Sequence, residues 1–370
     1  MKYYVTAILL YVLIFLFAAC VYASWPNYRG GQNLPGTTSG NIPESIKQRW
    51  AVSVGDDIKS SPVVYNGKIV VGAMNGVVYC FDLKGELAWE FETSNTIEGP
   101  ALIHENTVYI GNLGGDLYAI SLDTGSLKWT YTADNQIMAS PNIWSDGQRE
   151  YLLVGAYDYY LHCIDAASGE PVWKYEAQNY LHAAVAIEGD HAVFGGCDGF
   201  LHVIDIPSGD VVTRLEIASY VAGSSSVSRG KAFVGDYDGM FSCVDYLDGS
   251  ITWQFEAEDR QLPIIGAPSV TAGRVFFGSR DRYVYCLDRE SGEQLWARNT
   301  GSRVDASVLA GRENLLVANM RGDLLLLSQE IGDIIWAYEL SGPIVGSPAV
   351  SDGLVIAATQ DGVLYCLEGD

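Results

Sequence analysis

Positive charge is the scarcest property of this sequence. It has 22 Lys and Arg residues against 45 Asp and Glu, which gives a formal net charge of −23 at pH 7. An electrostatic field of that sign repels nucleic acids and anionic membrane surfaces, so neither is an expected partner. The same charge favours solubility and a cationic partner.

Helical periodicity and the common motifs of catalytic and metal sites are also missing. No stretch of useful length repeats apolar residues with the helical period, which argues against helices. The five histidines form no zinc pattern, and there is no Gly-x-Ser-x-Gly elbow and no phosphate-binding glycine loop before a helix. Turns such as Asp238-Gly239 lack the spacing and the terminal Glu of a calcium loop. None of these motifs therefore points to a catalytic or metal-binding residue.

Adjacent cysteines and the Cys-x-x-Cys spacing are absent, although the chain has seven cysteines. Five of them occupy one position of a repeat described below, and equivalent positions in successive repeats lie farther apart than the ~7 Å that a disulfide can span. We expect these thiols to be buried as small apolar side chains. They are Cys80, Cys163, Cys243, Cys286 and Cys366.

A degenerate repeat is what the sequence has in abundance. Its clearest copy, residues 77–89, is an apolar run ending in Asp, a glycine turn, and a Trp four residues after the glycine. Small residues, often with Pro, open each unit, and Pro62 and Pro348 are 286 residues apart over seven units. The resulting period of about 41 residues suits four-stranded propeller blades. Asn-Gly and Asp-Gly turns between short apolar runs predict antiparallel hairpins within each unit.

The last unit is incomplete, and a segment before the first unit supplies what it lacks. The eighth unit ends after three predicted strands, and residues 48–54 read as the missing fourth strand, with Trp50 in the Trp position. Pairing of residues 48–54 with 363–367 would close a ring and leave only short, protected edges. We therefore predict an all-β fold, an eight-bladed β-propeller of four-stranded antiparallel blades, as a single domain over residues 48–370.

The Trp series is expected to hold neighbouring blades together. A Trp buries ~200 Å² and can fill the wedge between two blades. The fourth unit has Thr213 in this position, which we attribute to sequence drift. The blade-docking residues are Trp50, Trp89, Trp129, Trp173, Trp253, Trp296 and Trp336.

The first 23 residues predict an export signal. One lysine precedes an uninterrupted apolar run over residues 3–19. One alternative is cleavage before Ser24, after a Val-Tyr-Ala site. A second is lipidation of Cys20, because residues 17–20 resemble a lipoprotein box. The third is an uncleaved N-terminal anchor. Each alternative places the body outside the cytoplasm. Residues 24–47 have no period, and we expect a surface loop there.

The Asp-x-x-(Ser/Thr/Asp)-Gly-x-x-x-Trp pattern, as at residues 165–173 and 245–253, resembles the pyrroloquinoline-quinone-type (PQQ-like) propeller repeat over residues 25–370. The resemblance implies an eight-bladed propeller and offers two functional branches. Quinoprotein dehydrogenases are much longer and carry two adjacent cysteines over a quinone cofactor. The compact BamB-like exported propellers are non-catalytic.

The chain has neither long insertions nor adjacent cysteines, so the resemblance implies the second branch. We expect a monomeric, non-catalytic scaffold without a cofactor, in the periplasm or cell envelope. Its partner would be another protein, for example in an outer-membrane complex, and its only membrane contact a lipid or N-terminal anchor. The alternative is a quinone-dependent dehydrogenase-like or carbohydrate-processing enzyme that uses the mouth of the channel.

Two groups of residues are candidates for a site on the loops, where propellers carry function. The loops entering the first strands end in small residues except at Glu98, His182 and Asp305. These could bind a cation or act as acid and base, but they come from units 2, 4 and 7 and should be spread around the ring. A partner-binding surface is predicted from residue types enriched in binding hot spots. Its residues are Tyr180, Tyr220, Arg260 and Arg303. For both groups, ordinary solvated loop residues are the alternative.

Overall fold

The structure is a computed structural model that describes residues 24–40, 42–217, 220–221, 223–258 and 260–369. The predicted export signal, its alternative cleavage sites and Cys20 lie outside these residues. Within them, no helix is both long and apolar enough to cross a bilayer.

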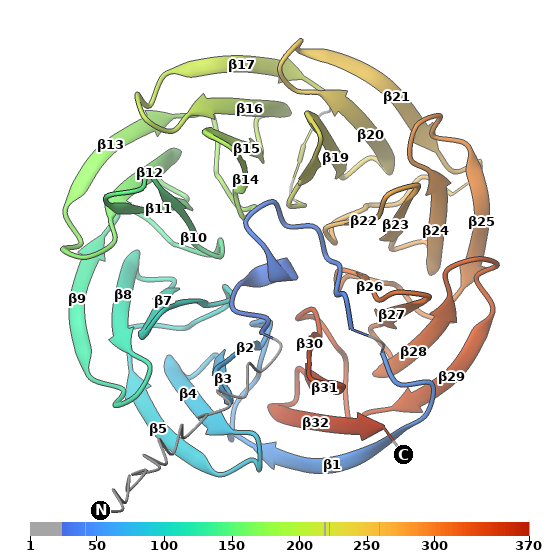
Figure 1. Ribbon diagram of the computed structural model, residues 1–370, viewed down its shortest axis with the longest axis horizontal. Helices are drawn as coiled ribbons and strands as arrows, with labels where there is room; N and C mark the ends of the chain where they lie inside the picture. The colour runs from blue at the N-terminus through green and yellow to red at the C-terminus, as the bar shows by residue number, and fades with distance from the viewer. Residues whose placement is uncertain (1–23, 41, 218–219, 222, 259, 370) are drawn as a thin grey trace, which may run out of the picture.

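Eight four-stranded sheets stand around a central axis (Figure 1), and every neighbouring pair of strands is antiparallel. Blade 1 has β2 (Val63–Tyr65), β3 (Lys68–Gly72), β4 (Val77–Asp82) and β5 (Leu87–Glu92). Blade 2 has β6 (Leu102–His104), β7 (Thr107–Gly111), β8 (Asp116–Ser121) and β9 (Leu127–Thr132). Blade 3 has β10 (Asn142–Ser145), β11 (Glu150–Gly155), β12 (Tyr160–Asp165) and β13 (Pro171–Glu176). Blade 4 has β14 (Ala186–Glu188), β15 (His191–Gly195), β16 (Phe200–Asp205) and β17 (Val211–Glu216).

The second half of the ring repeats the pattern. Blade 5 has β18 (Ser226–Ser228), β19 (Lys231–Gly235), β20 (Met240–Asp245) and β21 (Ser250–Glu256). Blade 6 has β22 (Ser269–Val270), β23 (Arg274–Gly278), β24 (Tyr283–Asp288) and β25 (Gln294–Asn299). Blade 7 has β26 (Leu309–Ala310), β27 (Asn314–Ala318), β28 (Asp323–Ser328) and β29 (Ile334–Glu339). Blade 8 has β30 (Ala349–Ser351), β31 (Leu354–Ala358), β32 (Val363–Gly369) and β1 (Ile46–Ser53).

The ring closes as the sequence predicts. Strand β1 pairs antiparallel with β32, and Trp50 stands opposite Cys366. The paired segment is slightly longer than expected, because Ile46 also pairs with Gly369. A hydrogen bond from the Ser347 amide to the Ser61 hydroxyl, 2.8 Å long, joins blade 8 to blade 1 at the inner wall.

Each repeat Trp docks on the next blade rather than on its own. The indole of Trp89 donates to the Leu122 carbonyl of blade 2 at 2.7 Å. Its ring also lies so close to Gly125 that a Cβ there would be 2.9 Å from the ring. The positive φ of 70° at Gly125 is a second reason for glycine. Hence, wherever the preceding blade carries the repeat Trp, that Trp requires the glycine at this turn.

The six cysteines in the described part of the chain are free and buried, which confirms the expectation of structural thiols. Five of them stand directly opposite a repeat Trp across the third and fourth strands, as Cys80 does opposite Trp89. Thr213 takes the Trp position of blade 4, opposite Val203, and its methyl group lies 3.1 Å from where a Cβ on Gly249 would be.

The prediction of a surface loop over residues 24–47 is wrong, because this N-terminal segment crosses the centre of the ring (Figure 1). Trp25, Arg29, Leu34 and Ile42 are at most 5% exposed. The backbone of the segment bonds to the inner strands of successive blades, for example Trp25 to Val64 at 2.7 and 2.9 Å and Gly36 to the Ala310 amide at 2.9 Å. We call residues 25–40 together with Ile42 the plug.

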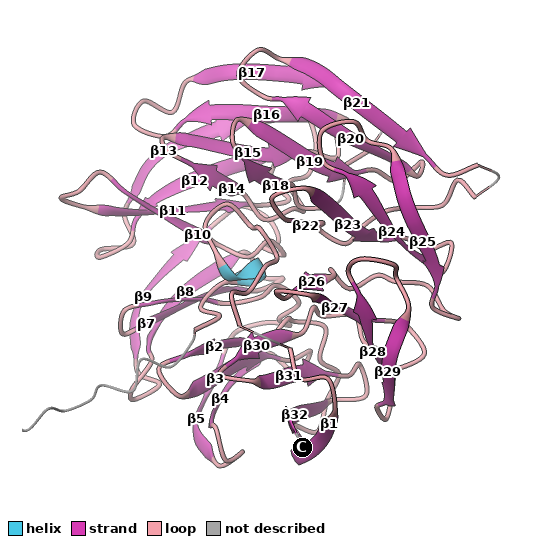
Figure 2. Cartoon of the chain, turned by 45° about the vertical axis from the view of Figure 1, so that its right-hand side comes forward, coloured by secondary structure: helices cyan, strands magenta, loops and turns pink. Residues whose placement is uncertain are grey.

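The plug holds a buried charge that has no acidic partner among the residues that the structure describes. In the short turn η1 (Tyr28–Gly30), drawn in cyan inside the ring in Figure 2, the Arg29 side chain is fully enclosed. Its guanidinium donates to the carbonyls of Val308 and Pro268, at 2.5 and 2.7 Å, and to the Ser269 hydroxyl at 3.1 Å. Burial lowers the pKa of Arg29 to about 10. The plug thus ties blades 6 and 7 together through one cation.

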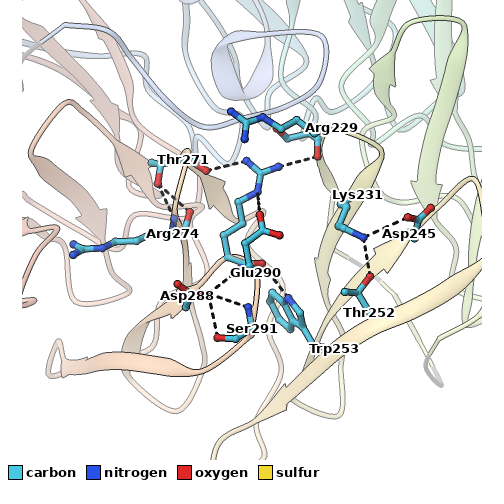
Figure 3. Close-up of polar contacts among 12 residues, drawn as sticks. Arg229, Lys231, Asp245, Thr252, Trp253, Thr271, Arg274, Asp288, Glu290 and Ser291 are labelled. Carbon is cyan, nitrogen blue, oxygen red and sulfur yellow. Dashed lines mark hydrogen bonds and ion pairs between the residues drawn. The ribbon is translucent and has the colours of Figure 1, made fainter.

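A second arginine, Arg289 in the turn between β24 and β25, joins two blades; Figure 3 shows the surrounding polar contacts, with Thr271 and Trp253 labelled. Arg289 of blade 6 donates to the Thr271 carbonyl at 3.1 Å and to the Ser228 carbonyl of blade 5 at 3.0 Å. The Arg289 carbonyl in turn accepts from the Trp253 indole at 3.0 Å. Polar side chains therefore reinforce the apolar contact between blades 5 and 6.

Candidate functional site

The plug makes the channel blind, and the candidate site lies at its open end. Each inner strand runs from a loop at this open end toward the plug, since plug residues bond near the ends of β2, β14, β18 and β26. The loops that join one blade to the next therefore gather at the opposite face, which we call the mouth face. Propeller loops of this kind carry the variable residues, while the blades supply a rigid scaffold.

A cavity of about 190 Å³, which we call the cup, opens at the centre of the mouth face. Its floor includes Tyr28 of the plug, whose hydroxyl lies 2.7 Å from the Ser307 hydroxyl of blade 7. An adjoining cavity of about 340 Å³ shares His182 and Asp305 with the cup and is lined further out by Tyr220, Tyr237 and Arg280.

Glu98, His182 and Asp305 all line the cup, although they come from blades on different sides of the ring. They come from different sides of the ring, as inferred from the sequence, and the inner wall is narrow enough for all three to line one cavity. Each acidic group has a basic partner: Lys59 lies 2.7 Å from Glu98, and Arg280 binds Asp305 through two contacts of 3.1 Å. No group of three metal-ligating side chains occurs among the described residues.

His182 is held in its neutral form. Its Nδ1 lies 2.7 Å from the Tyr157 hydroxyl. Burial lowers the pKa of His182, and the opposing effect of the Glu98 charge is smaller. Burial also raises the pKa of Tyr157 to about 12, so the phenol keeps its proton at neutral pH. Nε2 of His182 has no hydrogen-bond partner among the residues that the structure describes.

Serine hydroxyls line the wall of the cup and link neighbouring blades. Ser61, Ser224 and Ser347 are at most 7% exposed. Each hydroxyl oxygen accepts a backbone N–H of the preceding blade, at 2.8, 2.9 and 3.0 Å respectively. For the hydrogens of these three hydroxyls, the described part of the chain offers no acceptor. A serine hydroxyl has one donor and two acceptor positions, so each remains able to donate into the cup.

Aromatic rings form one sector of the rim. The Tyr180 ring stacks on Tyr157 with centroids 4.6 Å apart and lies 5.2 Å from Tyr159. On the next loop, Tyr220 meets Tyr237 edge to face at 5.1 Å. Tyr159, Tyr180 and Tyr237 remain 38–41% exposed. The sector is thus a pre-stacked aromatic surface rather than a set of isolated loop residues.

The arginines continue this sector across blades 6 and 7. The Arg260 guanidinium lies 4.2 Å above the Tyr283 ring and 4.0 Å from Asp281. Arg303 is 51% exposed and lies 3.6 Å from Asp305. We call Tyr159, Tyr180, Tyr220, Tyr237, Arg260, Arg280 and Arg303 the rim sector.

Sequence reasoning missed Tyr157, Tyr237 and Arg280, which belong to the turn between the second and third strands of their blades. The signal was available in the repeat: these three residues occupy equivalent positions, each two residues after the glycine that ends its second strand. The backbone N–H at this position bonds to the inter-blade loop, as in Tyr237 to the Tyr220 carbonyl at 3.1 Å. Loop and turn therefore display their side chains side by side.

Fold and site together define a class, the compact eight-bladed propellers built from PQQ-like repeats. The family model described as outer membrane protein assembly factor BamB matches residues 43–154, 157–282 and 280–370, and the chain belongs to this family. BamB of Kangiella koreensis is 30% identical over 125 residues, which are 34% of this chain and 31% of that protein. The chain thus spans about a third of the length of this curated relative.

Solved structures share the fold. The crystal structure of BamB from Moraxella catarrhalis is similar with a TM-score of 0.76 and 20% identity, over 88% of this chain and all of that chain. Quinohemoprotein alcohol dehydrogenase from Comamonas testosteroni is similar with a TM-score of 0.79 and 11% identity, over 94% of this chain and 81% of that chain. At such identities the likeness shows a common architecture and leaves function to the site.

Proposed function

We propose that this protein is a non-catalytic scaffold of the cell envelope that binds another protein through the rim sector. The observation that carries the proposal is the exposed combination of tyrosines and arginines on one side of the mouth face. Tyr and Arg are the residue types that dominate binding energy at protein interfaces, especially when rigid and grouped. The stacking of Tyr180 on Tyr157 and of Arg260 on Tyr283 keeps these side chains ordered before a partner arrives.

An envelope location is supported by two independent features. The N-terminal apolar run and the Cys20 box have the form of an export signal with a lipidation site. The relatives named BamB are assembly factors for outer membrane proteins by their names. We propose by analogy that the partner belongs to an envelope complex.

A quinone cofactor fits the cup poorly, and we propose that none is bound. The charged groups of the lining are already engaged in pairs, Lys59 with Glu98 and Arg280 with Asp305. In the described residues no three ligating side chains converge on a point where calcium could be held beside a quinone. Titration with pyrroloquinoline quinone and calcium tests this part: a stoichiometric bound chromophore with dye-linked dehydrogenase activity would refute it.

Site-specific photo-crosslinking in cells of the source organism tests the scaffold. A photoreactive residue at Tyr237, in the rim sector, should yield a discrete crosslinked partner. The matched control is Leu295 on the outer strand β25, which is 47% exposed but far from the mouth face by its place on β25. Equal products from both positions, or none from Tyr237, would contradict the proposed surface.

A further inference from the structure

The cup beneath the rim sector has a chemistry of its own. We propose that it binds one ring of a neutral polyhydroxylated molecule, a monosaccharide or one unit of a glycan, independently of the protein partner. This goes beyond the scaffold function, because it assigns a small-molecule site to a different set of residues.

Charge balance is the first argument. The two carboxylates that line the cup are neutralised, Glu98 by Lys59 at 2.7 Å and Asp305 by Arg280 at 3.1 Å; Arg303 also lies 3.6 Å from Asp305 but does not line the cup. An anion would have to displace a carboxylate from its partner, and a cation would have to displace Lys59 or Arg280. A neutral ligand can bond to the free edges of both pairs without breaking either. Partly buried ion pairs of this kind offer charge-assisted hydrogen bonds to a ligand.

Unused hydrogen-bonding capacity is the second argument. Ser61, Ser224 and Ser347 are at least nine-tenths buried and line the cup, yet each hydroxyl only accepts within the described structure. His182 also lines the cup, and its second ring nitrogen is free of described partners. A ligand that fits must therefore accept several hydrogen bonds and donate others, as a set of hydroxyl groups does.

Size and apolar surface are the third argument. A volume of about 190 Å³ is less than the ~300–1,000 Å³ of drug-sized pockets and is enough for one small ring. Tyr28 lies at the floor, while Met138 and Val345 add apolar surface to the wall. A sugar ring combines C–H faces, which pack on such side chains, with hydroxyl edges that reach the serines.

Saturation-transfer NMR and calorimetry on the full mature chain test the proposal. The probes are glucose, galactose and myo-inositol, with glucuronate and glucosamine as anionic and cationic analogues of similar size. We expect at least one neutral probe to bind, and both charged analogues to bind at least ten-fold more weakly. No neutral binding at 50 mM probe (about 50-fold above a millimolar Kd), or tighter binding of a charged analogue, would overturn the proposal.

Two variants tie binding to the cup. Ser347→Ala removes one donor, and His182→Phe keeps a ring but removes Nε2; each should weaken the neutral probe by about three- to ten-fold, the usual worth of one hydrogen bond. The control is Ser242→Ala, at a buried serine on β20 that accepts from Gln254 on β21 of the same blade and does not line the cup, and it should change nothing. Melting curves confirm that each variant is folded. Unchanged affinity in both folded cup variants would refute the site, whereas the crosslinking result at Tyr237 would stand.

Discussion

Replacing Arg29 by alanine should loosen the plug and, with it, the floor of the cup. The guanidinium makes three short hydrogen bonds to blades 6 and 7, and charge-assisted bonds contribute roughly 1.5–3 kcal/mol each. Desolvation offsets part of this: a pKa lowered from 12.5 to about 10 corresponds to about 3 kcal/mol at 1.36 kcal/mol per unit. The net loss in the free energy of unfolding should be about 2–5 kcal/mol.

Hydrogen exchange can localise this effect. Among the blade amides that donate to plug carbonyls, four lie on blades 4 to 7: Ile187 to Gln32 at 2.8 Å, Val227 to Asn33 at 3.0 Å, Val270 to Pro35 at 3.0 Å and Ala310 to Gly36 at 2.9 Å. In the variant these amides should exchange much faster than amides in the third strands of the blades. Their protection should fall because the plug opens locally while the ring stays closed.

A matched control separates the charge from its geometry. Arg29→Lys keeps the charge but cannot reach three acceptors with one planar group, so its exchange pattern should lie close to that of the alanine variant. Gly36→Ala should displace the Arg29 side chain without changing it, since a Cβ on residue 36 would lie 1.7 Å from the guanidinium. If Arg29→Ala costs less than about 1 kcal/mol and leaves the four amides protected, then the plug is held by its backbone alone and our reasoning fails.

The remaining predictions concern the blades. Trp89→Ala should cost about 3–5 kcal/mol by equilibrium denaturation, whereas Thr213→Ala at the equivalent position of blade 4 should cost less than about 1 kcal/mol; similar costs would contradict the docking role of Trp. Burial raises the pKa of Cys80 to about 12, so Ellman's reagent should leave it unmodified in the native protein at pH 8 and modify it after unfolding. Backbone N–H groups of the following turn lower the pKa of Asp245 and Asp288. The two ionised carboxylates therefore stabilise the fold above pH ~4, and this stabilisation is lost as the pH falls through their folded-state pKa. The denaturation midpoint should drop between pH 7 and pH 3, and it should drop less in Asp288→Asn.

The architecture could be predicted from local patterns because the strands and turns of nearly every blade come from one continuous unit of sequence. The turn glycines, the Asp that accepts from the turn after it and the Trp four residues past the glycine recur in most units, although unit 4 has Thr213 in the Trp position. Ring closure could also be predicted, because the eighth unit lacks a fourth strand and the segment that contains Trp50 matches the missing strand. The residues that each Trp contacts were harder to predict, because they belong to the following blade, as when Trp89 packs on Gly125.

The plug and the cup could not be read in this way. Arg29 bonds to residues 239 and 279 positions away, and an aperiodic segment gives no sign of such partners. Glu98, His182 and Asp305 could be picked out as exceptions in a ring of small residues, but their meeting in one cavity depends on the diameter of the closed ring. The sequence by itself determined the blades, their number and their closure, because these rest on contacts within a unit and on a period. Only the tertiary structure decided which end of the channel is shut and which side chains share its open end, because those contacts join residues that no local pattern relates.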